Sequence, residues 1–191
     1  MDDGFSPLAW PRVSLRARGL EAVLRWCPAE ESTAPPWLLV HSINAAASSA
    51  ELAPLAQRLS AQAPVALLDL PGFGDAPRPC HRYAIEDYVE AIAEAQRWVA
   101  ARAGQAPVLC ALSLSAEFAA RAVLWGAPTP PAVLWISPTG LDGRALQRGE
   151  ALAPPEQPVP HRGSERVYGW LHGRALGRWA FRLLRRPSVI R

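Results

Sequence analysis

One stretch of the sequence decides the fold. It reads PVLCALSLSAEFAARAVLW over residues 107–125. Its first part is a short apolar run behind a proline, which is typical of a strand buried on both faces. After Ser115 the apolar residues recur on one helical face, at Phe118, Ala119, Ala122 and Trp125. The stretch therefore predicts a strand, a sharp turn at Ser113 and a helix.

Small residues flank Ser113 two positions away on each side, Ala111 and Ser115. A nucleophile on a tight strand-to-helix turn has a strained backbone, and the strand and helix come too close for large side chains. The usual pattern has glycine at both positions, so this is a relaxed version of it. The alternative is a buried serine that caps the helix. The pattern leaves two hypotheses for Ser113, a catalytic nucleophile or a structural hydroxyl.

Short apolar runs alternate with amphipathic segments along the rest of the chain. Strands are predicted at 20–26, 37–40, 65–68 and 132–136, the last three of them buried, and helices at 52–59 and 85–102. Buried strands that alternate with helices form a parallel sheet through right-handed crossovers. We therefore expect an α/β fold, a mostly parallel sheet with helices on both faces.

Composition excludes several classes of protein. The chain has 191 residues, of which 50% are hydrophobic, enough for one domain with a substantial core. Its three cysteines, widely separated and odd in number, argue against a disulfide framework or a metal cluster. The N-terminus does not resemble a signal peptide, and no apolar run is long enough to span a membrane. We expect a cytoplasmic protein without a transmembrane segment, metal, cofactor or nucleic-acid partner.

Two loops follow predicted strands. The first, residues 41–49, is made of small and polar residues that let backbone N–H groups face an oxyanion. Its alternative is a plain connection in which His41 is a structural histidine with its hydrogen bonds satisfied. The second loop, residues 69–75, contains Gly72 and Gly74, which allow the chain to turn sharply above the sheet.

With these motifs in this order, the sequence resembles the α/β-hydrolase superfamily of the serine hydrolase type over residues 15–142. The loop at 41–49 is similar to the oxyanion loop after the third strand of the family. The turn at 69–74 is similar to the loop after its fourth strand, and Ser113 stands where the family has its nucleophile. The resemblance implies that Ser113 attacks a carbonyl and forms an acyl-enzyme.

The resemblance also implies an oxyanion hole made of backbone N–H groups. One would come from Leu114, the residue after the nucleophile, and the other from the segment of Ser42 and Ile43. Because these donors belong to the main chain, substitution of the side chains need not remove them.

The family orders its catalytic residues as nucleophile, acid and histidine, and here the sequence departs from it. Asp142 is the candidate acid, although an Asp-Gly pair is also typical of a turn. His161 and His172 follow the nucleophile, and His81 precedes it, but each also fits a surface or packing histidine. The last strands of the family, with their acid and histidine loops, are expected to be missing, so we expect a fold that is incomplete at the C-terminus.

Residues 143–191 differ from the core at 1–142. A proline-rich linker leads into an amphipathic segment, 167–186, with a basic stripe on one face. We interpret it as a helical segment similar to a lid. A helix that binds a membrane surface or a partner is the alternative.

Two functions remain open from the sequence. The first is a serine hydrolase that acts on a carboxylic ester with an apolar acyl group. The second is a truncated, catalytically inactive remnant that binds a small molecule or a partner. A truncated sheet would expose an apolar edge, and we therefore expect self-association through that edge.

Overall fold

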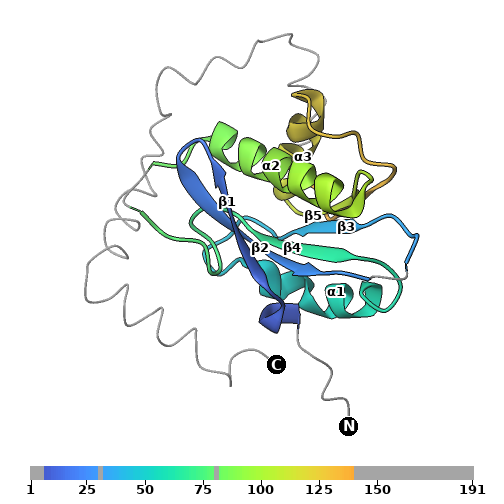
Figure 1. Ribbon diagram of the computed structural model, residues 1–191. Helices are drawn as coiled ribbons and strands as arrows, with labels where there is room; N and C mark the ends of the chain where they lie inside the picture. The colour runs from blue at the N-terminus through green and yellow to red at the C-terminus, as the bar shows by residue number, and fades with distance from the viewer. Residues whose placement is uncertain (1–6, 30–31, 80–81, 140–191) are drawn as a thin grey trace. The chain divides into compact units, whose positions relative to one another are not determined.

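The computed structural model describes residues 7–29, 32–79 and 82–139. Its elements in chain order are η1 (Pro7–Ala9), β1 (Arg12–Ala17), β2 (Leu20–Cys27), β3 (Trp37–Val40), η2 (Ser49–Leu52), α1 (Ala53–Leu59), β4 (Val65–Asp69), α2 (Ile85–Ala103), β5 (Val108–Leu112), α3 (Ser115–Leu124) and β6 (Val133–Ile136). The strands form one sheet in the order β1-β2-β4-β3-β5-β6 (Figure 1). The predicted α/β class is confirmed.

The parallel part of the sheet consists of β4, β3, β5 and β6. In the register of β3, Val40 lies opposite Leu68 of β4 on one side and Ala111 of β5 on the other. The carboxyl ends of these strands therefore meet at one edge, and the loops that follow them are neighbours. This register brings the loop after Val40 next to the turn at Ser113.

Helices cover both faces of the sheet, as predicted. Figure 1 shows α1 on one face and α2 and α3 on the other. Neighbouring residues of β3 separate into two clusters of the core, because side chains alternate along a strand. Leu38 and Val40 belong to the cluster that includes Ile92 of α2, while Leu39 packs with Ala56 of α1.

The sheet also has an antiparallel part that the sequence analysis missed. β1 pairs with β2, and β2 pairs antiparallel with β4. Arg18 and Gly19 connect the hairpin with φ of 51° and 80°, which are the left-handed angles that tight hairpin turns require. The signal was present in the sequence, since Val13, Leu15 and Ala17 alternate with polar residues up to this turn.

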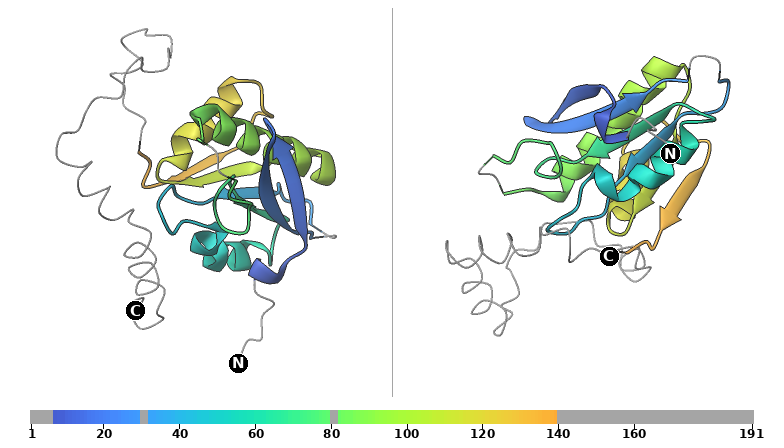
Figure 2. Two further views of the ribbon diagram at one scale, coloured as in Figure 1. Left: turned by 90° about the vertical axis from the view of Figure 1, so that its left-hand side faces the viewer. Right: turned by 90° about the horizontal axis from the view of Figure 1, so that it is seen from below.

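The prediction that β6 is a buried strand is wrong for the residues described. Val133 is 50% exposed and Leu134 is 40% exposed. β6 pairs with β5, and no other described strand lies beyond it. Figure 2 shows β6 and the β1–β2 hairpin at opposite edges of the sheet. The apolar sequence of β6 correctly predicted a strand but not its exposure.

Two predictions lie outside the described residues. They are the proline-rich linker and the lid-like helical segment, both within 143–191. Of the helices that the structure describes, none has the length and apolarity needed to cross a bilayer.

Candidate active site

Ser113 lies between β5 and α3 with a φ of 59°, a left-handed conformation that is uncommon for a serine. Its backbone is held in place, because its N–H donates to the Ile136 carbonyl at 2.9 Å and its carbonyl accepts from the Ala116 N–H at 3.1 Å. The side chain is only weakly engaged. Its Oγ lies 3.5 Å from the Oγ1 of Thr139 and is partly exposed. The turn therefore presents a hydroxyl with a firmly held backbone and a loosely held oxygen.

The small residues on either side of Ser113 are both fully buried. Ala111 pairs with Val40 of β3. The hydroxyl of Ser115 donates to the His41 carbonyl at 2.5 Å. This hydrogen bond joins the start of α3 to the loop after β3 and holds the two segments together.

The loop after β3 is organised by Glu51, a residue of η2. The Glu51 carboxylate accepts the Ser42 N–H and the Ser42 hydroxyl, each at 2.8 Å, and the Asn44 side-chain amide at 3.1 Å. The next backbone amide, that of Ile43, has no acceptor among the described residues, and neither does the amide of Leu114. Of the predicted oxyanion donors, Ser42 is therefore engaged elsewhere, while Ile43 and Leu114 have their N–H groups available.

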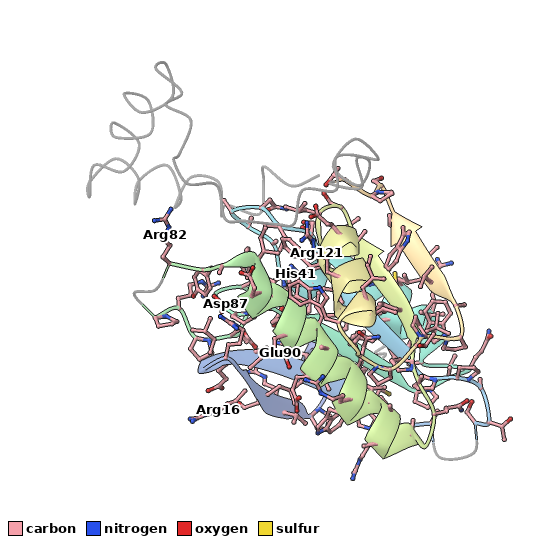
Figure 3. The ribbon with its side chains drawn as sticks, turned by 90° about the horizontal axis from the view of Figure 1, so that it is seen from above. Arg16, His41, Arg82, Asp87, Glu90 and Arg121 are labelled. Atoms are coloured by element: carbon pink, nitrogen blue, oxygen red, sulfur yellow. The ribbon has the colours of Figure 1, made fainter. Side chains whose placement is uncertain are left out.

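His41 is a buried structural histidine. Its Nδ1 donates to the Ser42 carbonyl at 2.5 Å, and its Nε2 accepts the Leu70 N–H at 3.1 Å. This pattern requires the neutral ring with the proton on Nδ1. Burial lowers the pKa of His41, and the Ser42 carbonyl and the carboxylates of Asp69 and Glu51 offset only part of that effect. Figure 3 looks down on α2 and α3 and labels this ring. Both nitrogens are occupied, so His41 is not available as a base for Ser113.

Asp69, at the end of β4, also has a structural role. Its carboxylate accepts the Ser49 N–H at 2.6 Å, the Asp75 N–H at 3.1 Å and the Arg25 guanidinium at 2.8 Å. Burial alone raises the pKa of this carboxyl, but these hydrogen bonds outweigh it, and the pKa is lowered. A Cβ on Gly74 would lie 2.1 Å from the carboxylate, so the predicted sharp turn needs glycine here for space as well as for its φ of 51°.

The remaining candidates for the acid and the base lie outside the described residues. They are Asp142, His81, His161 and His172. In the ranges 7–29, 32–79 and 82–139 the sequence contains no histidine other than His41. The same ranges hold no cluster of three or more His, Cys, Asp or Glu side chains that could bind a metal ion.

Glu51 and Thr139 were not predicted as residues of this site. An acidic residue in the first turn of a helix is common, because the helix dipole favours it there. Thr139 follows β6, and only the pairing of β6 with β5 brings it close to Ser113. No local pattern could have indicated either contact.

No protein-family model matches the sequence, and no curated protein matches it either. Solved structures do resemble it. An α/β hydrolase from Sphaerobacter thermophilus is 23% identical with a TM-score of 0.54, over 83% of this chain and 54% of its own.

Two further structural neighbours are a dehalogenase and a phospholipase. The haloalkane dehalogenase DatA from Agrobacterium tumefaciens is 19% identical with a TM-score of 0.52, over 67% of this chain and 41% of its own. A bacterial membrane phospholipase A is 22% identical with a TM-score of 0.57, over 92% of this chain and 62% of its own. The chain thus spans between about two fifths and three fifths of the length of these neighbours. Identities this low show the fold and leave the substrate open. The chain has the fold of the α/β-hydrolase superfamily.

Proposed function

We propose that this protein is a serine hydrolase in which Ser113 is the nucleophile. One observation carries the proposal, namely a strained, partly exposed serine at the edge of the sheet where two backbone amides, those of Ile43 and Leu114, have no acceptor among the described residues. The register of β3 and β5 places Ile43 and Leu114 in neighbouring loops at the carboxyl edge of the sheet. Their position supports the proposal, because in acyl transfer the oxyanion forms next to the attacking oxygen and needs donors there.

The reaction would proceed through an acyl-enzyme. The Ser113 Oγ attacks the carbonyl carbon of an ester and gives its proton to a base, and the oxyanion accepts hydrogen bonds from Ile43 and Leu114. The C–O bond to the alcohol breaks, and the alcohol leaves with that proton. Water then adds to the acyl carbon and releases the carboxylic acid and Ser113. We propose Asp142 as the acid that orients the base.

We propose an ester with an apolar acyl group as the substrate. The side chains of Ile43, Phe73 and Leu114 are apolar, partly exposed, and belong to the loops at this edge of the sheet. Phe73 continues into the interior, where its ring contacts His41 at a centroid distance of 5.1 Å. Contact with apolar side chains of this kind favours a hydrocarbon acyl chain over a polar one.

A fluorophosphonate probe tests the assignment of Ser113. Its fluoride leaves as the serine oxygen bonds to phosphorus, so it marks an activated serine. We expect labelling of the full chain, its loss in Ser113→Ala, and no change in Ser60→Ala. Ser60 is a matched control, because its hydroxyl donates only to the Gln57 carbonyl at the end of α1. Labelling that persists in Ser113→Ala would exclude Ser113 as the nucleophile.

A second function is favoured by one observation. Among the described residues, the only side chain hydrogen-bonded to Ser113 is that of Thr139, which is not a base. The alternative proposal is therefore a catalytically inactive α/β-hydrolase chain that binds a small molecule or a partner. A folded, cooperatively melting protein that the probe does not label would support this alternative.

We also propose self-association of the chain through β6. Val133 and Leu134 expose apolar surface on a strand that has one partner among the described strands. An edge of this kind can pair with the same edge of a second copy. Sedimentation velocity should show a dimer that Leu134→Lys weakens. A monomer at all concentrations would contradict self-association.

A further inference from the structure

We propose that Glu51 is a positioning residue for the oxyanion hole, which it shapes by selecting the backbone amide that faces the substrate. The inference rests on the proposed function of Ser113. Its starting point is the difference between two consecutive amides, since Ser42 donates to Glu51 while Ile43 has no acceptor among the described residues.

Both oxygens of the Glu51 carboxylate are used. Oε2 accepts the Ser42 N–H, and Oε1 accepts both the Ser42 hydroxyl and the Asn44 side chain. The Asn44 Nδ2 also donates to the Ser42 Oγ at 2.6 Å, so the three side chains form a closed network. A carboxylate that accepts a backbone N–H and two side-chain donors fixes the backbone of this loop more firmly than any one contact.

The network extends to both sides of the loop. On the far side, the Asn44 Oδ1 accepts the Ala46 N–H at 2.9 Å. On the near side, Glu51 lies two residues after Ser49, whose amide the buried Asp69 holds at 2.6 Å. The carboxylate is therefore carried by an anchored segment, and it holds the Ser42–Asn44 segment against that anchor.

The consequence for catalysis follows from geometry. Since the Ser42 N–H points to Glu51, it is withdrawn from the reacting centre, and Ile43 supplies the N–H on this side. An oxyanion hole works because its donors are oriented before the charge develops. Loss of the Glu51 carboxylate should free the loop, and stabilisation of the transition state should fall while substrate binding stays nearly constant.

The test compares variants by hydrolysis of p-nitrophenyl butyrate and by amide hydrogen exchange. Glu51→Ala should lower kcat by about 10-fold to 100-fold, which is less than complete loss of an oxyanion donor, and should change KM little. It should also speed exchange of the Ser42 amide. Glu51→Gln keeps an acceptor for that amide and should restore most of kcat. Glu86→Ala, an exposed glutamate in the first turn of α2, is the matched control and should behave as the parent.

Three outcomes are distinguishable. Lower kcat in Glu51→Ala, with recovery in Glu51→Gln and faster exchange at Ser42, supports the proposal. A kcat of Glu51→Ala equal to that of the parent overturns it and leaves Ser113 as the nucleophile. A parent protein that neither hydrolyses the ester nor reacts with the fluorophosphonate overturns the proposed function, and with it the role of Glu51 in catalysis.

Discussion

The polar side chains at the carboxyl ends of β4 and β5 differ in burial and in the number of their hydrogen bonds. At the end of β4, Asp69 is 1% exposed, and its carboxylate accepts hydrogen bonds from Ser49, Asp75 and Arg25. At the end of β5, the Ser113 hydroxyl is partly exposed, and its one side-chain partner among the described residues is Thr139, with 3.5 Å between the two oxygens. β3 separates these strands, so both sites belong to the same edge of the sheet. We call the surroundings of Asp69 the saturated site, because its carboxylate oxygens already accept several hydrogen bonds. The hydroxyl of Ser113 is still available to form hydrogen bonds.

The two kinds of site suit different purposes, since one stabilises the fold and the other meets a requirement of catalysis. A buried carboxylate is tolerated only when its hydrogen bonds and a counter-charge compensate for its lost hydration. The saturated site does this, and it holds the 69–75 turn and η2 in place. Catalysis requires the reverse condition, because donors that already have acceptors cannot stabilise a charge that develops later. The fold therefore uses Asp69 to build the edge, whereas Ile43, Ser113 and Leu114, the residues of the proposed site, keep groups without acceptors or strong partners among the described residues.

The largest expected effect is on the saturated site. Asp69→Ala removes the buried counter-charge of Arg25, which is itself 4% exposed, and leaves the Ser49 amide without its acceptor. We expect a loss of about 3 kcal/mol in the free energy of unfolding, since removal of one partner of a buried ion pair costs about 3 to 5 kcal/mol. Denaturant titration followed by circular dichroism measures it.

Asp75→Ala is the matched control for that loss. Asp75 also pairs with Arg25, but its side chain is 40% exposed. Because water screens a partly exposed carboxylate, we expect Asp75→Ala to cost clearly less than Asp69→Ala. Equal losses for the two variants would show that the burial of Asp69 does not matter, and the contrast between the sites would fail.

Acid should also destabilise the protein at Asp69, but by less than the Asp69→Ala substitution does. The pKa of Asp69 is lowered in the folded protein by the hydrogen bonds from Ser49, Arg25 and Asp75. A carboxyl with a depressed folded pKa stabilises the protein fully above its unfolded pKa of about 3.9, and this stabilisation is lost as the pH falls through the folded value. The free energy of unfolding should therefore decline as the pH falls below about 4.

The Asp69→Asn variant tests whether this carboxyl causes the decline. Asparagine cannot titrate, so the variant should lose less stability between neutral and acid pH than the parent does. An identical pH profile in parent and variant would assign the acid sensitivity to other carboxylates.

Local patterns predicted the parallel strands and their helices because burial on both faces leaves a continuous apolar run. They also indicated Ser113, since a tight strand-to-helix turn leaves room only for small residues on either side of it. The exposure of Val133 and Leu134 was not predictable, because an apolar run shows that a strand can be buried and not that a neighbour covers it.

The details of the site depend on contacts between distant parts of the chain. Arg25 reaches Asp69 from another strand, and Thr139 reaches Ser113 from the segment after β6. The engagement of Ser42 by Glu51 is closer in sequence, but no periodicity indicates it. The sequence predicted a donor from the segment of Ser42 and Ile43 without saying which residue supplies it, and only the hydrogen bonds distinguish the two.

The smallest expected effect concerns the contact that joins the two loops. Ser115→Ala removes the hydrogen bond from a fully buried hydroxyl to the His41 carbonyl. We expect a loss of about 1 to 2 kcal/mol, because the variant leaves a buried carbonyl without this donor. Ser60→Ala, which removes an exposed hydroxyl, should cost less. Fluorophosphonate labelling of Ser113 should slow in Ser115→Ala, since the loop that carries Ile43 is then held less firmly beside the turn. Unchanged labelling together with lower stability would show that this contact supports the fold alone.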